Sequence, residues 1–317
     1  MTADPFSEIL KFTSAQTMVT GGFTAGGLWA LRFPAPEKIK FFAVVKGACW
    51  IRLEGEAEPV HALTGDVLLL AARRAFILAS DLSVPPLDAM AVFSGCKIAQ
   101  LGDGNDFTHI GGHVLLDQAS GRLLADVLPP WIHIKASSPQ AAILRWILDQ
   151  LVREQADGRP GASLATAQLA QLLFIQVLRA HLETSDMMPA GWLRALADPR
   201  LAPALRLMHG EPGRDWHLDE LARAAAMSRT SFAFHFKQIA GVAPLTYLTQ
   251  WRMHLAERAL REEDMPVAVL ARSLGYTSES AFSNAFKRAT GNAPKRYRTA
   301  RQAEPRDAEA QPLSLVS

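Results

Sequence analysis

Two short segments of the chain, 50 residues apart, carry hydrogen-bonding, basic and apolar side chains around a pair of phenylalanines that recurs in both. Asparagine can pair with adenine and arginine with guanine through two hydrogen bonds each, and an apolar group can contact the methyl group of thymine. Lysine and arginine also neutralise phosphates. These segments are therefore candidates for reading DNA. The candidate residues are Arg229, Thr230, Ala233, Phe234, Lys237, Ser280, Ser283, Asn284, Lys287, Arg288 and Arg298.

An internal repeat predicts equivalent structures for the two segments. At an offset of 50 residues, Ser228 matches Ser278, Phe232 matches Phe282, Phe236-Lys237 matches Phe286-Lys287, Gly241 matches Gly291, Ala243-Pro244 matches Ala293-Pro294 and Tyr247 matches Tyr297. Upstream, residues 221–223 parallel residues 270–272 at an offset of 49. Each copy is predicted to be a helix, a tight turn and a second helix.

The second helix of each copy has a recognisable start and an apolar face. Ser228 and Ser278 are expected N-caps, because their hydroxyls can accept hydrogen bonds from amides two or three residues on. The phenylalanines recur at i and i+4, so they and the next residue in that series, Ile239 or Ala289, are expected to point into a core. The opposite face is the one that DNA would meet.

The turn between the two helices differs between the copies. Gly275 can adopt a positive φ, whereas the first copy has Ala225 and Ala226, so we expect a wider or less strained turn there. A helix over 244–260 follows the first copy and is expected to hold both copies rigidly. Two recognition helices fixed in this way would enter successive major-groove segments about 34 Å apart.

Phe234 has an alternative interpretation. It alternates with Phe232 and Phe236, which would also suit a strand or a core, and the polar residues near it could be merely solvated. The second copy replaces this residue by Asn284 and keeps both flanking phenylalanines. That replacement favours an exposed, DNA-reading position.

Charge is concentrated in the same region. The 317-residue chain has a formal net charge of +2, yet residues 214–301 hold 14 lysines and arginines against 8 acidic residues. Such a basic segment is typical of a part that meets phosphate. No apolar run approaches the ~20 residues of a membrane span, and residues 1–5 lack the basic start of a signal peptide, so we expect a soluble, cytoplasmic protein without a membrane partner.

The N-terminal half predicts a β-rich domain followed by two helices, so the expected fold class is α+β with two domains. Short apolar stretches between about residues 18 and 116 are punctuated by glycine, proline and aspartate, as in a sandwich or barrel. Helices are expected at 141–154 and 163–183. The apolar stripe of the second helix could pack on its own domain or form a dimer interface. The expected parts are 1–187 with helices 139–185, 198–299, and a disordered tail at 302–317.

Four motifs then identify a family: MSRTSF at 227–232, GVAP at 241–244, GYTSESAF at 275–282 and GNAPKRYR at 291–298. Together they resemble the double helix-turn-helix, DNA-binding domain of the AraC/XylS family, over roughly residues 198–299. The resemblance implies that bases are read by Thr230, Ala233, Phe234, Ser280, Ser283 and Asn284. Phe234 stands where that family often has arginine, so the sequence preference of the family is not carried over.

The N-terminal half is similar to the β-barrel, cupin-type sensor domains of this family, through residues 26–33 and 65–70. The nearest subgroup is that of the reactive-chlorine-responsive activators. Enzymatic cupins hold a metal in a histidine and glutamate cluster, but Phe76 stands where the second motif would offer histidine, and residues 46–58 contain no His-x-His. The resemblance therefore implies no metal and no cofactor. The remaining histidines, interpreted as structural, are His61, His109 and His113.

Cys49 and Cys96 are the candidates for redox sensing. A thiol can be oxidised reversibly when its thiolate is favoured and exposed. Both lie in strand-like, apolar surroundings, where a free cysteine acts as a small hydrophobe. The sensing cysteine of the chlorine-responsive proteins precedes a glycine, whereas here Ser94 takes that place. Small-molecule sensing, or the absence of any ligand, is therefore kept beside redox sensing.

Three functions compete. The favoured hypothesis is a sequence-specific DNA-binding transcription regulator, an activator by family resemblance, whose N-terminal domain binds a signal and whose helices 139–185 form a homodimer. Its expected partners are double-stranded promoter DNA, RNA polymerase and an unidentified small-molecule effector. A cupin enzyme with a helical appendage would need a metal site, and an adaptor that assembles through its helix pair would lack sequence preference on DNA.

Overall fold

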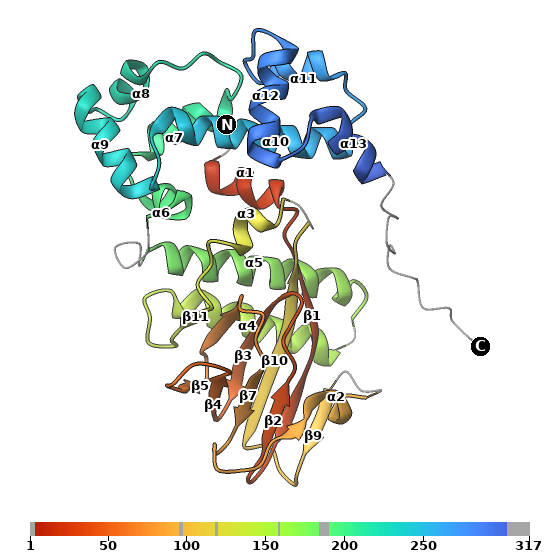
Figure 1. The fold of residues 1–317 in the computed structure, drawn as a ribbon. Coiled ribbons are helices and arrows are strands. Elements are labelled where there is room, and N and C mark those ends of the chain that lie inside the picture. The colour runs from red at the N-terminus through yellow and green to blue at the C-terminus, as the bar shows by residue number, and fades with distance from the viewer. Residues whose placement is uncertain (1–3, 95–97, 118–119, 158, 184–189, 303–317) are drawn as a thin grey trace. The chain divides into compact units, whose positions relative to one another are not determined.

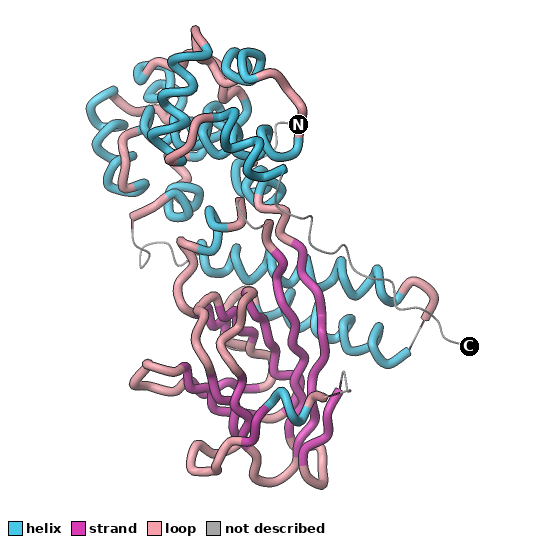
Figure 2. The backbone as a smooth tube through the Cα atoms, turned by 45° about the vertical axis from the view of Figure 1, so that its right-hand side comes forward, coloured by secondary structure: helices cyan, strands magenta, loops and turns pink. Residues whose placement is uncertain are grey.

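The chain divides into two compact units, one of Ile9–Pro189 and the other of Met1–Glu8 with Ala190–Ser317. The computed structural model describes residues 4–94, 98–117, 120–157, 159–183 and 190–302 (Figure 1). The first unit combines strands with helices, and the second is helical (Figure 2). The predicted α+β, two-domain class is confirmed. Among the described helices, none has the length and apolar character needed to cross a membrane.

Two sheets form the β-rich part of the first unit. Within the described residues, one has six strands in the order β11-β6-β3-β10-β1-β9 and the other five in the order β5-β4-β7-β2-β8. The first contains β11 (Trp131–Ile134), β6 (Val67–Leu70), β3 (Ile39–Lys46), β10 (Phe107–Leu115), β1 (Gln16–Ala25) and β9 (Ile98–Leu101). The second contains β5 (Val60–Leu63), β4 (Ala48–Leu53), β7 (Phe76–Ala79), β2 (Ala30–Phe33) and β8 (Leu87–Asp88).

The inner faces of the two sheets share one apolar core. Successive strand residues point to opposite faces, so Phe42 and Val44 of β3 face Leu31 of β2 and Leu78 of β7 across this core. Across β1 and β10, the antiparallel register pairs Phe23 with His109 and Gly21 with Gly111. These four positions therefore lie on the inner face.

A buried carboxylate fastens the edge of the six-stranded sheet. Asp66, 3% exposed, accepts hydrogen bonds from Nε2 of His133 at 2.7 Å, from the Ala136 amide at 2.7 Å and from the Leu63 amide at 3.0 Å. Buried carboxylates require such partners because the unpaired charge is strongly disfavoured away from water. Asp66 thus joins the turn before β6 to the end of β11.

Two long helices lie side by side, and the second packs on β1 and β11 of the six-stranded sheet (Figures 1 and 2). They are α4 (Ala141–Asp157) and α5 (Ala162–Leu182), which confirms the helices predicted there. The apolar residues of α5 that include Leu173 and Val177 are buried, and Gln171 accepts hydrogen bonds from the amide and hydroxyl of Thr17 on β1. The stripe therefore packs within its own unit. The short helices are α1 (Pro5–Phe12), α2 (Ala89–Val92) and α3 (Arg122–Ala125).

The second unit contains the predicted repeat. Its described helices are α6 (Trp192–Ala197), α7 (Ala202–Gly210), α8 (Leu218–Ala224), α9 (Arg229–Ala240), α10 (Pro244–Glu262), α11 (Val267–Ser273), α12 (Glu279–Thr290) and α13 (Pro294–Gln302). Helix α6 lies between the two parts predicted at 1–187 and 198–299, in a proline-flanked segment for which no helix was predicted. It buries Leu193 and Ala195, so it is part of the packed unit.

Candidate nucleic-acid interface

The two copies of the repeat have the same local structure. Each second helix begins at a serine whose hydroxyl accepts a hydrogen bond from the amide three residues on, at 3.2 Å from Ser231 to Ser228 and at 3.2 Å from Ala281 to Ser278. Each ends at a glycine in the left-handed conformation, with φ of 76° at Gly241 and 79° at Gly291. The predicted N-caps and helix-turn-helix units are confirmed.

The turns between the helices are also alike, against expectation. Gly275 has φ of 80° and the equivalent Ala226 has φ of 52°. The amide of each donates to the carbonyl three residues earlier, at 3.0 Å in both copies. The prediction of a wider or less strained turn in the first copy is wrong, because alanine adopts the left-handed conformation there in spite of its Cβ.

Aromatic rings anchor the inner face of each second helix. Phe232 and Phe236 of α9 are fully buried, as are Phe282 and Phe286 of α12. In each copy a tyrosine that starts the following helix meets the second phenylalanine, at 5.5 Å for Phe236–Tyr247 and 5.3 Å for Phe286–Tyr297. The expected core face is thus confirmed for the phenylalanines. Ala289 is exposed, so its placement in that core was wrong.

Helix α10 belongs to both cores. Tyr247 and Leu248 pack in the core of the first copy, and Met253, Ala256 and Leu260 pack in the core of the second. One continuous helix therefore sets the relative position of the two copies, as the sequence predicted.

The outer faces of α9 and α12 present the predicted reading residues. Phe234 is 67% exposed, so the alternative that placed it in a strand or a core is wrong. The exposed candidates are Arg229, Thr230, Phe234, Lys237, Ser280, Asn284, Lys287 and Arg288, while Ala233 and Ser283 are half-buried. Arg229 lies 3.6 Å from a carboxylate oxygen of Asp219, an exposed pair that contributes little and leaves the guanidinium available.

Arg298 differs from the other basic candidates. Its side chain is 19% exposed, lies 3.5 Å from the Asp264 carboxylate and donates a hydrogen bond to the Met265 carbonyl. These contacts tie α13 to the turn between α10 and α11. The structure therefore gives Arg298 a packing role, and the predicted phosphate contact finds no support in its position.

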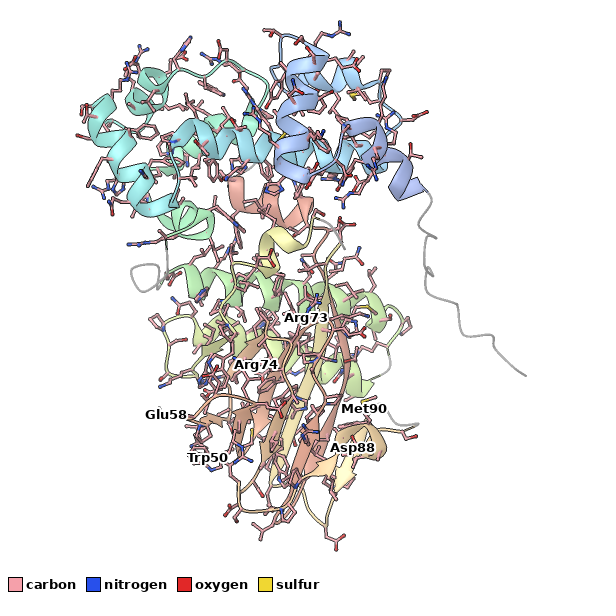
Figure 3. The ribbon with its side chains drawn as sticks, viewed as in Figure 1. Trp50, Glu58, Arg73, Arg74, Asp88 and Met90 are labelled. Carbon is pink, nitrogen blue, oxygen red and sulfur yellow. The ribbon has the colours of Figure 1, made fainter. Side chains whose placement is uncertain are left out.

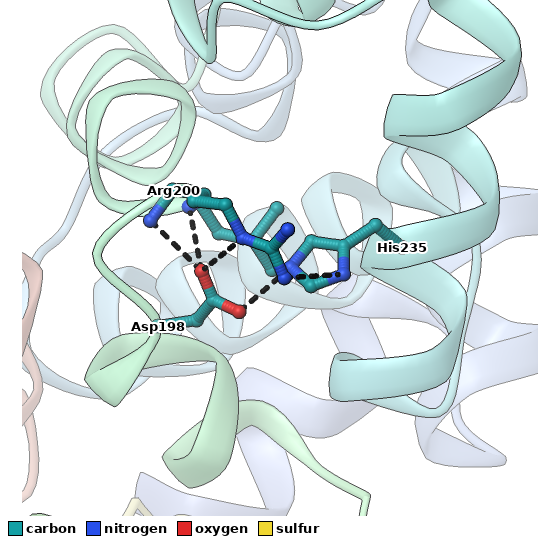
Figure 4. A network of polar contacts seen from close by, with 4 residues as sticks. Asp198, Arg200 and His235 are labelled. Atoms are coloured by element: carbon teal, nitrogen blue, oxygen red, sulfur yellow. Dashed lines mark hydrogen bonds and ion pairs between the residues drawn. The ribbon is translucent and has the colours of Figure 1, made fainter.

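A polar network that the sequence did not indicate holds α9 in place (Figure 4). Nε2 of His235 donates to Asp198 at 2.7 Å, and an Arg200 nitrogen donates to Nδ1 of His235 at 3.2 Å. Since Nδ1 accepts, the proton of the neutral ring lies on Nε2. Asp198 also accepts from the amides of Arg200 and Leu201. The network joins the corner between α6 and α7 to the inner side of the first recognition helix. Asp198 and His235 lie 37 residues apart in the sequence, so no local sequence pattern indicates this contact.

A second buried polar pair lies between α7 and α10. His209 Nε2 is 2.8 Å from the hydroxyl of Tyr247, and the imidazole stacks on Trp251 at 4.3 Å. Burial lowers the pKa of His209 to about 4. The ring is therefore neutral at physiological pH and acts as a structural residue.

Cys49 is the redox-sensing candidate of the other unit whose surroundings the structure describes. Cys49 is 1% exposed on β4, and burial, together with the charge of Asp66, raises the pKa of its thiol to about 12. The reactive thiolate is therefore strongly disfavoured, which weighs against redox sensing at Cys49. Cys96 lies outside the described residues. Among the described residues, no group of three histidine, cysteine or acidic side chains is placed to hold a metal.

Comparison with known proteins adds to this geometry. A family profile described as Cupin matches residues 4–183, and one described as Helix-turn-helix domain matches residues 221–300. A putative AraC-like transcription regulator of Streptomyces antibioticus is 41% identical over 93% of this chain and 98% of its own. The chain belongs to the family of AraC-like transcription regulators. It is thus a DNA-binding regulator with an N-terminal cupin domain, which confirms the family resemblance.

Two further proteins are similar to this regulator. The RCS-specific HTH-type transcriptional activator RclR of Escherichia coli is 28% identical over 93% of the regulator and 97% of its own length. The DNA-binding domain of AdpA, solved in complex with a target DNA, is 30% identical and covers 35% of the regulator and 100% of that domain, with a TM-score of 0.33.

Proposed function

We propose that this regulator is a cytoplasmic homodimer that activates transcription when its cupin domain binds a small-molecule signal. In this proposal each protomer reads promoter DNA with α9 and α12 and then recruits RNA polymerase. The cupin domain senses and does not catalyse. The observation that carries the DNA-reading part is the repeated, serine-capped helix whose inner face is fixed by buried phenylalanines and whose outer face is exposed.

Base reading is assigned to the residues near the start of each recognition helix. Asn284 can pair with adenine through two hydrogen bonds, and Phe234 can contact a thymine methyl. Thr230, Ser280, Ala233 and Ser283 line the same faces. The exposed Lys237, Lys287 and Arg288 contact phosphates and set the affinity and its dependence on salt.

Footprinting on the DNA upstream of the regulator's own and neighbouring genes tests this assignment. We expect a protected site with two contacts per protomer, one helical turn apart, that a Phe234→Ala/Asn284→Ala double variant weakens selectively. Loss of one good base contact lowers affinity by about 1–3 kcal/mol. The control is Gln250→Ala, exposed on α10 and outside the recognition helices. Salt-sensitive binding with no sequence preference, in wild type and variants alike, would instead support the adaptor hypothesis.

The homodimer is assigned to the face of α4 that the sheet leaves uncovered. Ile143 and Trp146, three residues apart on α4, are 41% and 53% exposed. An exposed tryptophan beside an aliphatic residue is typical of a helix face that packs on a partner. On α5, Leu173 and Val177 are buried within their own unit, so α4 offers the more exposed apolar side chains.

Sedimentation equilibrium tests the dimer. We expect Trp146→Glu to yield monomers at concentrations where the wild type is dimeric. Gln168→Glu, which adds the same charge at an exposed position of α5, should leave the dimer intact. A monomeric wild type, or equal effects of both variants, would contradict the assignment. A promoter–reporter measurement with purified RNA polymerase then tests activation against repression.

A further inference from the structure

A cavity of about 240 Å³ lies between the two sheets of the first unit. Aromatic rings from both sheets and from α2 form much of its wall, namely Phe33, Phe42, Phe76 and Phe93. The rings of Phe33 and Phe76 stack in parallel at 4.8 Å, and Phe93 lies 6.1 Å from Phe33. Such flat apolar walls favour a flat, aromatic occupant. The volume limits that occupant to a small molecule.

The cavity exists because glycines occupy inward positions where other residues would fill the space. Gly21 and Gly111 are partners across β1 and β10, one inward step from the pair of Phe23 and His109. A Cβ at Gly111 would lie 2.8 Å from Cε1 of His109. The absence of side chains at both glycines leaves the imidazole of His109 uncovered at the inner end of the cavity.

His109 lines the cavity with one edge of its ring. The residue is 9% exposed, and a Cβ at Gly111 would lie 3.0 Å from its Nε2, whereas its Nδ1 is buried with no hydrogen-bond partner among the described residues. Burial lowers the pKa of His109 to about 3, so the neutral ring offers one donor and one acceptor nitrogen. Nε2 is therefore the nitrogen that a hydroxyl on a bound molecule can meet.

Lys40 places a cation in the wall of the cavity. Lys40 and His113 are partners across β3 and β10, four residues along from the pair of Val44 and His109. At about 3.3 Å per residue, the two pairs lie about 13 Å apart. Burial, and then the charge of Lys38, lower the pKa of Lys40, and within the described part of the chain the Lys40 ammonium forms no ion pair. A carboxylate is the group that this half-buried cation lacks.

The mouth of the cavity opens beside α2. Met90 is 64% exposed and lines the opening, and Asp88, labelled with it in Figure 3, caps the helix by accepting from the Met90 amide at 2.9 Å. Because Met90 is both exposed and part of the lining, the cavity reaches the surface beside this side chain.

We propose that this cavity is the effector site, and that its ligand is a hydroxylated aromatic carboxylic acid of two fused rings. The rings lie against the phenylalanine wall, the carboxylate meets Lys40 and the hydroxyl reaches His109. The proposal rests on the sensing role assigned to the cupin domain and specifies the chemistry of its ligand.

Titration calorimetry on the full-length protein with 6-hydroxy-2-naphthoate as the probe tests the site. We expect one molecule bound per chain, with Lys40→Gln and His109→Leu each weakening binding about ten-fold. Lys46→Gln is the matched control, because Lys46 ends the same strand, is exposed and bonds to Asn105. His109→Leu removes the unpaired polar atom and keeps an apolar side chain, so thermal melting should show an unchanged or higher melting temperature.

Probe analogues separate the two polar contacts. 2-Naphthoate, which lacks the hydroxyl, should bind the wild type about ten-fold more weakly than the probe and bind His109→Leu as well as the probe does. 6-Hydroxy-2-naphthamide, which lacks the charge, should not distinguish wild type from Lys40→Gln. Absent binding of the probe, equal losses in Lys40→Gln and Lys46→Gln, or tighter binding of decanoate than of the probe would overturn the proposal.

DNA footprinting of the same variants distinguishes this proposal from the function on which it rests. A footprint that persists in the wild type while the probe fails to bind overturns only the ligand. Binding of the probe at the expected site, with no sequence-specific footprint under any condition, overturns the proposed function and leaves the cavity assignment standing.

Discussion

In the turn of the first copy, substitution by glycine should have opposite effects on stability at the neighbouring positions 225 and 226. Ala226 has φ of 52°, and the left-handed conformation destabilises a residue with a Cβ by roughly 1–2 kcal/mol. Replacement by glycine removes this cost but adds a cost of roughly 0.5–1 kcal/mol, because glycine has a larger conformational entropy in the unfolded chain. Ala226→Gly should therefore stabilise the helical unit by about 0.5–1 kcal/mol.

The preceding residue provides the control. Ala225 has φ of −83°, which suits alanine, so Ala225→Gly should destabilise the same unit by about 0.5–1 kcal/mol. Gly275→Ala in the second copy should destabilise it by more than about 2 kcal/mol, because its Cβ would lie 2.3 Å from the Gly213 carbonyl oxygen.

Calorimetric melting of the full chain measures all three variants. A change of 1 kcal/mol moves the melting temperature of a unit this size by about 4–8 °C. The expected order is Ala226→Gly above wild type, then Ala225→Gly, then Gly275→Ala. A lower melting temperature for Ala226→Gly, or equal shifts at Ala225 and Ala226, would refute the reasoning from backbone conformation.

Three further outcomes follow from buried polar groups. Asp66→Ala should destabilise the cupin domain by about 3 kcal/mol, since it leaves three partly buried donors unpaired; a loss under about 1 kcal/mol in urea unfolding would contradict its role. The pKa of His209 is about 4 when folded and ~6.5 when unfolded, so the unfolded chain binds the extra proton as pH falls through this window. The free energy of unfolding should therefore fall by about 3 kcal/mol between pH ~6.5 and pH 4. Urea unfolding at several pH values should show a smaller fall for His209→Gln. The same fall in wild type and variant would contradict this role of His209. In a Cys96→Ser background, Cys49 should react with a thiol reagent far more slowly in the native than in the urea-unfolded chain, and comparable rates would show that its burial does not protect it.

The repeat made most of the helical unit predictable. Spacing alone indicated the serine caps, the buried phenylalanines and the exposed position of Phe234, because these depend on contacts within one turn of helix. The repeat did not predict the turn at Ala226 correctly, since a glycine in one copy does not show whether an alanine in the other copy adopts the same φ. It did not indicate the contact of Arg298 with Met265, because that partner lies in a turn 33 residues away.

The cupin domain was predictable only in outline. Short apolar stretches punctuated by glycine, proline and aspartate indicated the strands and the fold class, but not the register that brings Gly21 opposite Gly111. His109 was interpreted as a structural residue bonded to its neighbours, whereas its Nδ1 is left unpaired beside a cavity that no local pattern encodes. The pairing of Asp198 with His235 has the same character, because tertiary packing alone brings the two residues together.

The shared helix α10 limits how the DNA target of this regulator can change over evolution. An α-helix turns by about 100° and rises about 1.5 Å for each residue. One residue inserted between Leu248 and Met253 would rotate α12 away from the groove face that α9 defines. Substitutions on α9 and α12 can therefore alter which bases are read. The number of base pairs between the segments read by α9 and by α12 stays constant, because α10 fixes the distance and angle between the two helices.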